Sequence, residues 1–144
     1  MNLSDLAGRP VLDLATATNI GKVADFVIDP VTRRIVGFQL AKVKGPASWL
    51  AWDAMNTLGA DALTIDRPDV LTEPPEHSRG LRADKVIGGR VLTDSGRELR
   101  NLVDLEIDPD TGQVTGLKIG DHSMPADALI GVGRYATVVA DPQD

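Results

Sequence analysis

The stretch Asp104–Ile119, DLEIDPDTGQVTGLKI, has a second copy in this chain of 144 residues. That copy is Asp25–Leu40, DFVIDPVTRRIVGFQL, which lies 79 residues earlier. The copies share two aspartates, a proline, a threonine and a glycine, and seven more positions pair two apolar residues when 21–40 is aligned with 100–119. A repeat of this kind indicates two structural units with one folding pattern.

Each copy predicts two β-strands joined by a tight turn. Val103 and Leu105 alternate with polar neighbours, which is the period of a half-buried strand. The first copy offers Ala24 and Phe26 on the corresponding inward face. The turn Asp108–Gly112 supplies a proline that presets one turn angle, side chains that bond to local backbone and a glycine for the left-handed position.

The same turn has a second interpretation as a metal site. Asp108, Asp110 and Gly112 have the spacing that opens a calcium-binding loop, but Ile119 stands where such a loop needs a bidentate glutamate. A hairpin turn therefore explains the pattern better. Arg33 stands where the second copy has Gly112, and a residue with a Cβ pays roughly 1–2 kcal/mol in a left-handed conformation.

The whole chain shows short strands, tight turns and almost no helix. Five short strands given twice predict an all-β fold of two tandem small β-barrels, related by an internal repeat of about 79 residues. We place the first unit at 1–66 and the second at 83–144, joined by a Pro-containing extended linker at 67–82. Units of this size bury only about 60% of their unfolded surface, so each is expected to lean on the other or on a second subunit.

The composition excludes several kinds of site. The chain has no cysteine, which excludes a disulfide framework, a thiolate metal site and a cysteine nucleophile. Its beginning, MNLSDLAGRP, lacks the pattern of a signal peptide, and no apolar run is long enough to span a membrane. We therefore expect a cytoplasmic protein. The net charge is −6, of which residues 83–144 contribute −5, so direct nucleic-acid binding is disfavoured.

No constellation of catalytic residues emerges from the sequence. The two histidines, His77 and His122, are too few for a metal site. Asp121 and Ser123 flank His122 with the residue types of a catalytic triad, but neighbours on a strand point to opposite faces. Gly88-Gly89 precedes a strand rather than a helix, so it lacks the helix N-terminus that would bind phosphate. We therefore predict a protein that is not an enzyme and has no cofactor.

Short motifs along the chain resemble those of the PRC-barrel family. In the first copy they are Gly8-Arg9-Pro10-Val11, Gly21-Lys22-Val23-Ala24-Asp25, Ile28-Asp29-Pro30, Trp52-Asp53 and Leu58-Gly59-Ala60-Asp61-Ala62. In the second copy they are Gly88–Val91, Val103-Asp104, Asp108–Gly112 and Gly133. The sequence departs from the family pattern at Arg33, where glycine is usual, and the second copy has Arg100 where the first has Gly21. The resemblance covers nearly the whole chain apart from the linker.

The resemblance implies a fold more strongly than a function, because its motifs are turns and core positions. It implies a pair of small barrels used for protein interaction. Relatives include the cytoplasmic subunit of photosynthetic reaction centres, the C-terminal domain of a ribosome maturation factor and division-associated proteins of archaea. None of these roles transfers by fold alone.

Four residues of the first unit form the predicted interaction surface. Strand alternation turns Trp49, Val23 and Val27 outward, and Trp52 lies close to them in sequence. The corresponding residues of the second copy are Ser123, Leu102, Glu106 and Ala126. Apolar outward positions on a nearly neutral unit predict a cover, which is either the second unit, a second copy of the chain in a homodimer or another protein.

These observations favour a non-enzymatic adaptor that acts through contact with a protein partner. One alternative is an accessory factor in ribosome or RNA maturation, against which the acidic charge argues. Another is a small-molecule-binding barrel, which an apolar pocket between the two units would support. The sequence does not name the partner.

Overall fold

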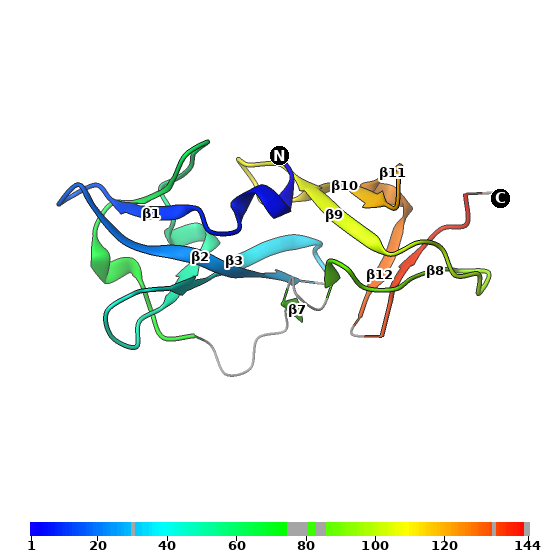
Figure 1. Cartoon of the computed structure of the whole chain (residues 1–144), viewed down its shortest axis with the longest axis horizontal. Coiled ribbons are helices and arrows are strands. Elements are labelled where there is room, and N and C mark those ends of the chain that lie inside the picture. Colours follow the sequence, from blue (N-terminus) through cyan, green and yellow to red (C-terminus); the bar gives the residue numbers. More distant parts are fainter. Residues whose placement is uncertain (30, 75–80, 83–85, 134, 143–144) are drawn as a thin grey trace.

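The computed structural model describes residues 1–29, 31–74, 81–82, 86–133 and 135–142. Its regular elements are β-strands and short 3-10 turns (Figure 1). Those of the first half are η1 (Leu3–Leu6), β1 (Pro10–Asp13), β2 (Thr18–Asp29), β3 (Arg34–Ala41), β4 (Trp49–Ala51), η2 (Trp52–Ala54), β5 (Thr57–Leu58), β6 (Leu63–Ile65) and η3 (Pro68–Val70). Those of the second half are β7 (Leu81–Arg82), β8 (Val91–Thr93), β9 (Leu102–Ile107), β10 (Val114–Ile119), β11 (His122–Pro125), η4 (Ala126–Ala128), β12 (Leu129–Val132) and β13 (Thr137–Val139).

The strands of each half pair in the same order. In the first unit, β1 to β6, the sheet runs β4-β3-β2-β1-β6-β5, and β1 pairs with β6 in parallel. In the second unit, β8 to β13, the order β11-β10-β9 forms one sheet and β12-β13-β8 another, with β8 and β13 again parallel. Backbone bonds from Gly88 N to Leu102 O (2.6 Å) and from Leu102 N to Gly89 O (3.0 Å) join these two sheets. Among the described residues, the two end strands of each order do not pair with each other, so neither unit closes into a full barrel.

A β-bulge interrupts the second strand of each unit, and it changes which side chains face inward. Val23 pairs with Leu40 and Asp25 with Gln39, so Ala24 is the extra residue of the first bulge. Val103 is the extra residue of the equivalent bulge in β9, and it is 49% exposed. The prediction that Ala24 and Val103 face inward was therefore wrong, since strict alternation fails across a bulge.

The aspartate that follows each bulged residue explains why the bulge forms there. The Oδ1 atom of Asp25 accepts the N–H of Phe26 (2.9 Å). The Oδ1 atom of Asp104 accepts the N–H of Leu105 (2.8 Å) in the same way. A bulge removes a backbone donor from the ladder, and the carboxylate supplies the acceptor that it would otherwise lack. Phe26 and Leu105 are buried, as predicted.

The two hairpin turns have the same conformation. The N–H of Arg33 donates to the carbonyl of Asp29, and that of Gly112 donates to Asp108, both at 2.8 Å. Arg33 has φ 60° and Gly112 has φ 76°, so both stand in the left-handed region. The Oδ1 atom of Asp108 accepts the N–H of Asp110, which is a turn interaction rather than a metal ligand. Pro30 lies outside the described residues.

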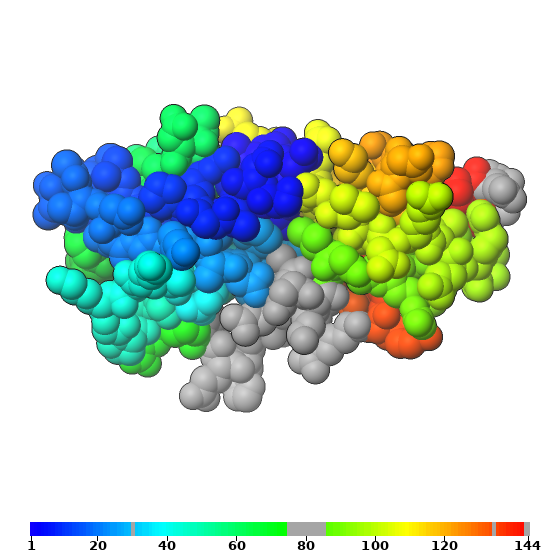
Figure 2. Space-filling model, in the orientation of Figure 1, coloured from blue at the N-terminus to red at the C-terminus, as the bar shows by residue number. Residues whose placement is uncertain are grey.

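The two units lie side by side along the long axis of the molecule (Figure 1). Buried apolar residues from β1 to β6 and from β8 to β13 belong to one continuous core cluster. Figure 2 shows that the N-terminal residues lie near the middle, against the second unit. No helix among the described residues is long and apolar enough to cross a membrane. The expectation that each small unit leans on its neighbour agrees with this shared core.

The segment predicted as an extended linker, 67–82, is partly built into the first unit. η3 occupies Pro68–Val70, and Leu71 is 9% exposed. Thr72 forms a β-bridge with Trp49, and β7 adds to the edge of β2. In these described parts, the segment predicted as an extended linker therefore pairs its backbone groups with strand edges of the first unit. Residues 75–80, including His77, lie outside the described ranges.

Candidate interaction surfaces

Three of the four predicted surface residues are buried. Val23 is 1% exposed, and Val27 and Trp49 are each 6% exposed. Val23 is inward because the bulge at Ala24 shifts the alternation, so its prediction as an outward residue was wrong. Val27 lies between β3 and β7, opposite Gly37 on one side. These residues therefore do not form an exposed patch.

Trp49 does point away from the inward Leu50, but the first unit itself covers it. A Cβ at Gly37 would lie only 2.5 Å from the Cζ2 atom of Trp49, so the indole packs directly on that glycine. The backbone N–H and carbonyl of Trp49 bond to Thr72 at 2.9 and 3.0 Å. Trp49 is therefore covered by its own half of the chain, by Gly37 and the segment at Thr72, and not by the second unit, a second copy or another protein as expected.

Trp52 lies where the two units meet. It is partly buried, and its ring centroid is 5.9 Å from that of Phe38. A Cβ at Gly112 would lie 3.0 Å from the Cε2 atom of Trp52, so the indole packs against the hairpin turn of the second unit. Under the sequence repeat, Arg33 corresponds to Gly112 and Ala126 corresponds to Trp52. The Arg33 guanidinium donates to the carbonyl of Ile130 at 3.3 Å.

The two hairpins join through their backbones. The N–H of Ile35 donates to the carbonyl of Gly112, and the N–H of Val114 donates to that of Arg33, both at 2.9 Å. Arg34 and Gln113 form the bridge between these bonds. Residues 33, 34 and 35 are the counterparts of 112, 113 and 114 under the repeat, so the junction is pseudo-symmetric and its local two-fold axis passes through this bridge.

The units also exchange short strands. Asn2 bridges to Glu106 at β9, and the Ile107 N–H donates to the carbonyl of Met1 at 2.8 Å. In the other direction, Arg82 of β7 pairs with Val27 of β2. Arg82 is the counterpart of Asn2, and Val27 of Glu106, so the two pairings are equivalent. Each unit therefore completes the edge of the other with the segment that precedes its own first strand.

A buried carboxylate fastens one of these exchanged segments. Asp104 is 6% exposed, and its Oδ1 atom accepts the N–H of Ser4 at 3.0 Å. Its Oδ2 atom also accepts the hydroxyl of Ser4. Leu3 and Leu6 on either side of Ser4 are fully buried. The start of the chain is therefore a structural part of the second unit.

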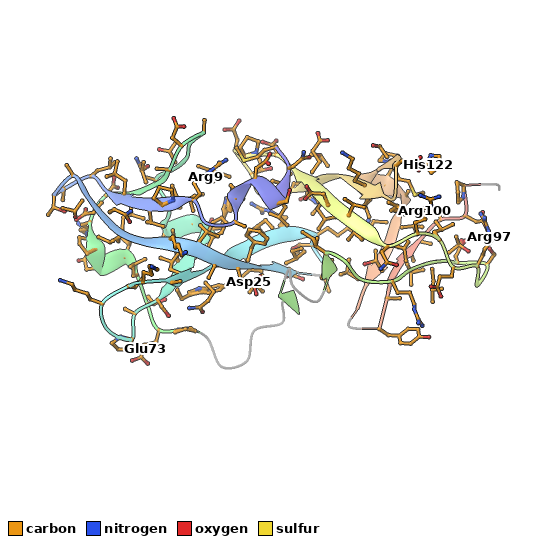
Figure 3. All side chains as sticks on the ribbon, viewed as in Figure 1. Arg9, Asp25, Glu73, Arg97, Arg100 and His122 are labelled. Carbon is orange, nitrogen blue, oxygen red and sulfur yellow. The ribbon has the colours of Figure 1, made fainter. Side chains whose placement is uncertain are left out.

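A groove lies at the far end of the second unit. It has a volume of about 750 Å³ and includes Arg97, Arg100, His122, Met124 and Pro142 in its lining. Figure 3 shows that Arg97, Arg100 and His122 gather at this end of the molecule. The Arg97 guanidinium pairs with Asp141 at 2.8 Å. No described residue forms an ion pair with Arg100.

The first unit has a smaller groove in the equivalent place. Its volume is about 430 Å³, and Thr18–Ile20, Lys42, Val43 and Pro68 are among its lining. Residues 42–47 form a loop that the second unit lacks, and a Cβ at Gly21 would lie 2.7 Å from Val43 Cγ2. The loop therefore fills space that remains open in the second unit.

Sequence reasoning did not identify the groove of the second unit. Two signals were present: the shorter connection before His122, and Arg100 in the place of Gly21. In the structure Arg100 packs over Gly120, where a Cβ would lie 2.5 Å from its Cδ atom. These signals became informative only when the two folded units could be compared.

The side chains considered for catalysis are not assembled into a site. His122 Nε2 lies 3.6 Å from Asp121 Oδ1, and both side chains are about four-fifths exposed. Among the described residues, no group of three or more His, Asp or Glu side chains could hold a metal ion. An exposed pair at this distance is a weak surface interaction.

The class of protein that this architecture defines is all-β, built from small open or half-barrel sheets. Within that class, residues 1–71 match the family model of the PRC-barrel domain. This match covers the first unit, in agreement with the resemblance of the motifs from Gly8 to Ala62, and it extends through η3 to Leu71. No curated protein matches the chain significantly.

Proposed function

We propose that this protein is a non-enzymatic, cytoplasmic adaptor built from two PRC-barrel-like units, and that it acts by binding another protein. The observation that carries the proposal is the junction between the units. Each unit presents a hairpin turn and the edge of its second strand, and each receives a short strand from the other. The fold thus already uses strand addition to bind a folded neighbour, which is a common mode of protein recognition.

The equivalent strand order of β8 to β13 supports the proposal that the second unit is also a PRC-barrel-like domain. Its bulge at Val103, its turn at Asp108–Gly112 and its parallel β8–β13 pair have counterparts in the first unit. A duplicated domain has two copies of each surface. One copy can join the two units to each other while the second copy binds a partner protein.

The small-molecule alternative has less support. The pocket that Trp52, Asn56 and Asp110 help to line at the hairpin junction has a volume of about 140 Å³. Ligand pockets usually enclose about 300–1,000 Å³. A barrel that binds small molecules between its units would need a larger and more enclosed cavity at this place.

The proposal is tested by capturing partners from the native host with the full chain as bait. The tag is joined to the C-terminus through a long flexible linker, because the N-terminal amine of Met1 bonds to the carbonyl of Ile107 at 3.2 Å and Pro142 lines the groove of the second unit. Captured proteins are identified by mass spectrometry, and each candidate is then purified and titrated by calorimetry. We expect one protein to form a saturable binary complex. Partners that disappear after nuclease treatment would instead support the RNA-maturation alternative, and no binary complex with any purified candidate would contradict the proposal.

A further inference from the structure

β11 is an edge strand in the second unit, whereas its counterpart β4 is not a free edge. Ser123 pairs with Lys118 in the register in which Trp49 pairs with Gln39. The N–H and carbonyl of Trp49 face outward and bond to Thr72. The backbone N–H and carbonyl of Ser123 therefore face the outer edge as well. Among the residues that the structure describes, β11 has β10 as its one strand neighbour.

Among the described residues, the groove beside this edge is larger in the second unit than in the first, at about 750 against 430 Å³. Leu71 packs into the core cluster next to the first groove, which it lines together with Pro68. The larger groove of the second unit contains Pro142, the counterpart of Pro68, but no described counterpart of Leu71. On the outer face of the sheet, a hollow of about 440 Å³ borders Gly116 and Ser123. The indole of Trp49 occupies the equivalent position over Gly37.

The charges of the two grooves indicate the chemistry of a segment that could pair with the outer edge of β11. The first groove has Lys42 and Lys44 in its lining, and the segment that closes it, 68–73 or PDVLTE, has two acidic residues and no basic one. The second groove has Arg97, Arg100 and His122 in its lining. Arg97 is paired with Asp141, while the Arg100 guanidinium has no ion pair among the described residues. Asp69 of the first segment pairs with Arg67 at 2.8 Å, and Glu98 also lines the second groove. The cation that the second groove offers to an acidic segment is therefore Arg100.

We infer that the second unit binds an extended, acidic peptide segment of a partner protein, which adds as an antiparallel strand to the outer edge of β11. Its backbone pairs with Ser123 as Thr72 pairs with Trp49. An aliphatic side chain at the position of Leu71 enters the groove beside Met124 and Pro142, and a large side chain at the position of Thr72 fills the outer hollow. The inference rests on the proposed adaptor function, and it names the surface and the partner chemistry for that function.

The first experiment uses capped hexapeptides and nuclear magnetic resonance of the full chain labelled with nitrogen-15. The probes are PDVLTE, a form with tryptophan in place of threonine, a form with asparagine and glutamine in place of the two acids, and a scrambled form. We expect PDVLTE to shift the amide signals of Ser123 and its neighbours in β11 saturably. The tryptophan form is expected to bind more tightly, the neutral form more weakly, and the scrambled form not at all.

Two variants separate the edge interaction from other effects. Ser123→Pro removes the outward N–H and leaves the bonds between β10 and β11 intact, so it should weaken binding about fivefold or more, as expected for the loss of a backbone hydrogen bond. Ser123→Ala keeps the N–H and should bind like the unaltered chain. Because proline could disturb folding, Arg100→Ala is a second test that leaves the strand unchanged, and it should weaken PDVLTE more than the neutral peptide.

Four other outcomes would contradict either the inference or the adaptor function on which it rests. β11 signals that shift with protein concentration alone would show a second copy of the chain at the edge. Shifts produced equally by inorganic phosphate and by PDVLTE would show a simple anion site. If a captured protein binds the chain but leaves the β11 signals unchanged, the adaptor function stands and this surface is wrong. If no protein binds while the peptides do, the surface stands and the adaptor function is wrong.

Discussion

At the scale of single residues, the two hairpin turns show how the same backbone tolerates different side chains. Arg33 and Gly112 have the same left-handed conformation, but only glycine adopts it without a steric cost. The guanidinium of Arg33 donates an exposed hydrogen bond to the carbonyl of Ile130. Gly112 is required for a second reason, because the indole of Trp52 leaves little room for a Cβ.

We predict that Arg33→Gly raises the free energy of unfolding, by up to about 1 kcal/mol after the greater freedom of the unfolded chain is subtracted. Gly112→Ala should lower it by more than about 1 kcal/mol, since the substitution combines a strained φ with a contact of 3.0 Å to Trp52. Denaturant unfolding of both variants measures the two changes. Equal effects of the same sign would contradict the steric explanation.

The register of β9 makes a second prediction. Leu105 is 3% exposed and Glu106 is exposed, so Leu105→Ala should cost about 2–5 kcal/mol while Glu106→Ala stays within about 0.5 kcal/mol. The pair is matched because the two residues are neighbours on one strand. Urea denaturation of each variant gives the comparison, and a larger loss for Glu106→Ala would mean that the register is wrong.

At the scale of elements, the first residues of the chain stabilise the second unit, although it is the first unit that follows them in the sequence. Asp104 accepts the backbone N–H groups of Ser4 and Leu105 and also the Ser4 hydroxyl. Removing its carboxylate would leave the buried N–H of Leu105 and the part-buried N–H of Ser4 without this acceptor. Such unsatisfied groups cost more than the bond itself contributes.

We therefore predict that Asp104→Ala lowers the free energy of unfolding by about 1–3 kcal/mol or more. Ser4→Ala is the matched control, because it loses the hydroxyl but keeps the backbone donor, and its cost should be about 1 kcal/mol or less. Amide hydrogen exchange should also show that Asp104→Ala lowers the protection of Ile107, whose N–H donates to Met1. Unchanged protection at Ile107 would mean that the exchanged segment is held independently of Asp104.

At the scale of the whole molecule, the exchanged strands and the hairpin junction join two small units into one cooperative structure. Their apolar residues form a single core cluster. A unit of about 65 residues buries too little surface to be robust alone, and the shared core offsets this shortage. We therefore expect the two units to depend on each other for stability.

We predict a single two-state unfolding transition. Trp49 and Trp52 both belong to the first unit, but Trp52 also packs against Gly112 of the second unit, so Trp49 in a Trp52→Phe background is the reporter for the first unit. Leu117→Ala, a core change in the second unit, should lower the denaturation midpoint seen by fluorescence as much as that seen by circular dichroism, with a cost of about 2–5 kcal/mol. A fluorescence midpoint that does not move would show that the two units unfold separately.

The sequence by itself determined the all-β class, the two hairpins and the turns. These features depend on neighbours in the chain: alternation over a few residues, a proline and a glycine at fixed turn positions, and a repeated aspartate. The same local logic gave Phe26 and Leu105 their buried positions. The alternation also predicted that Trp49 points away from Leu50, but it did not predict which residues cover Trp49.

Only the tertiary structure decided which surfaces are free. The bulges reversed the alternation at Val23 and Val103, since a bulge depends on pairing with another strand. Thr72 covers the edge at Trp49, whereas no described segment pairs with the edge at Ser123, because strand edges are satisfied by segments distant in sequence. Burial at an edge depends on what the folded chain brings to it, and the pattern of the strand alone does not contain that information.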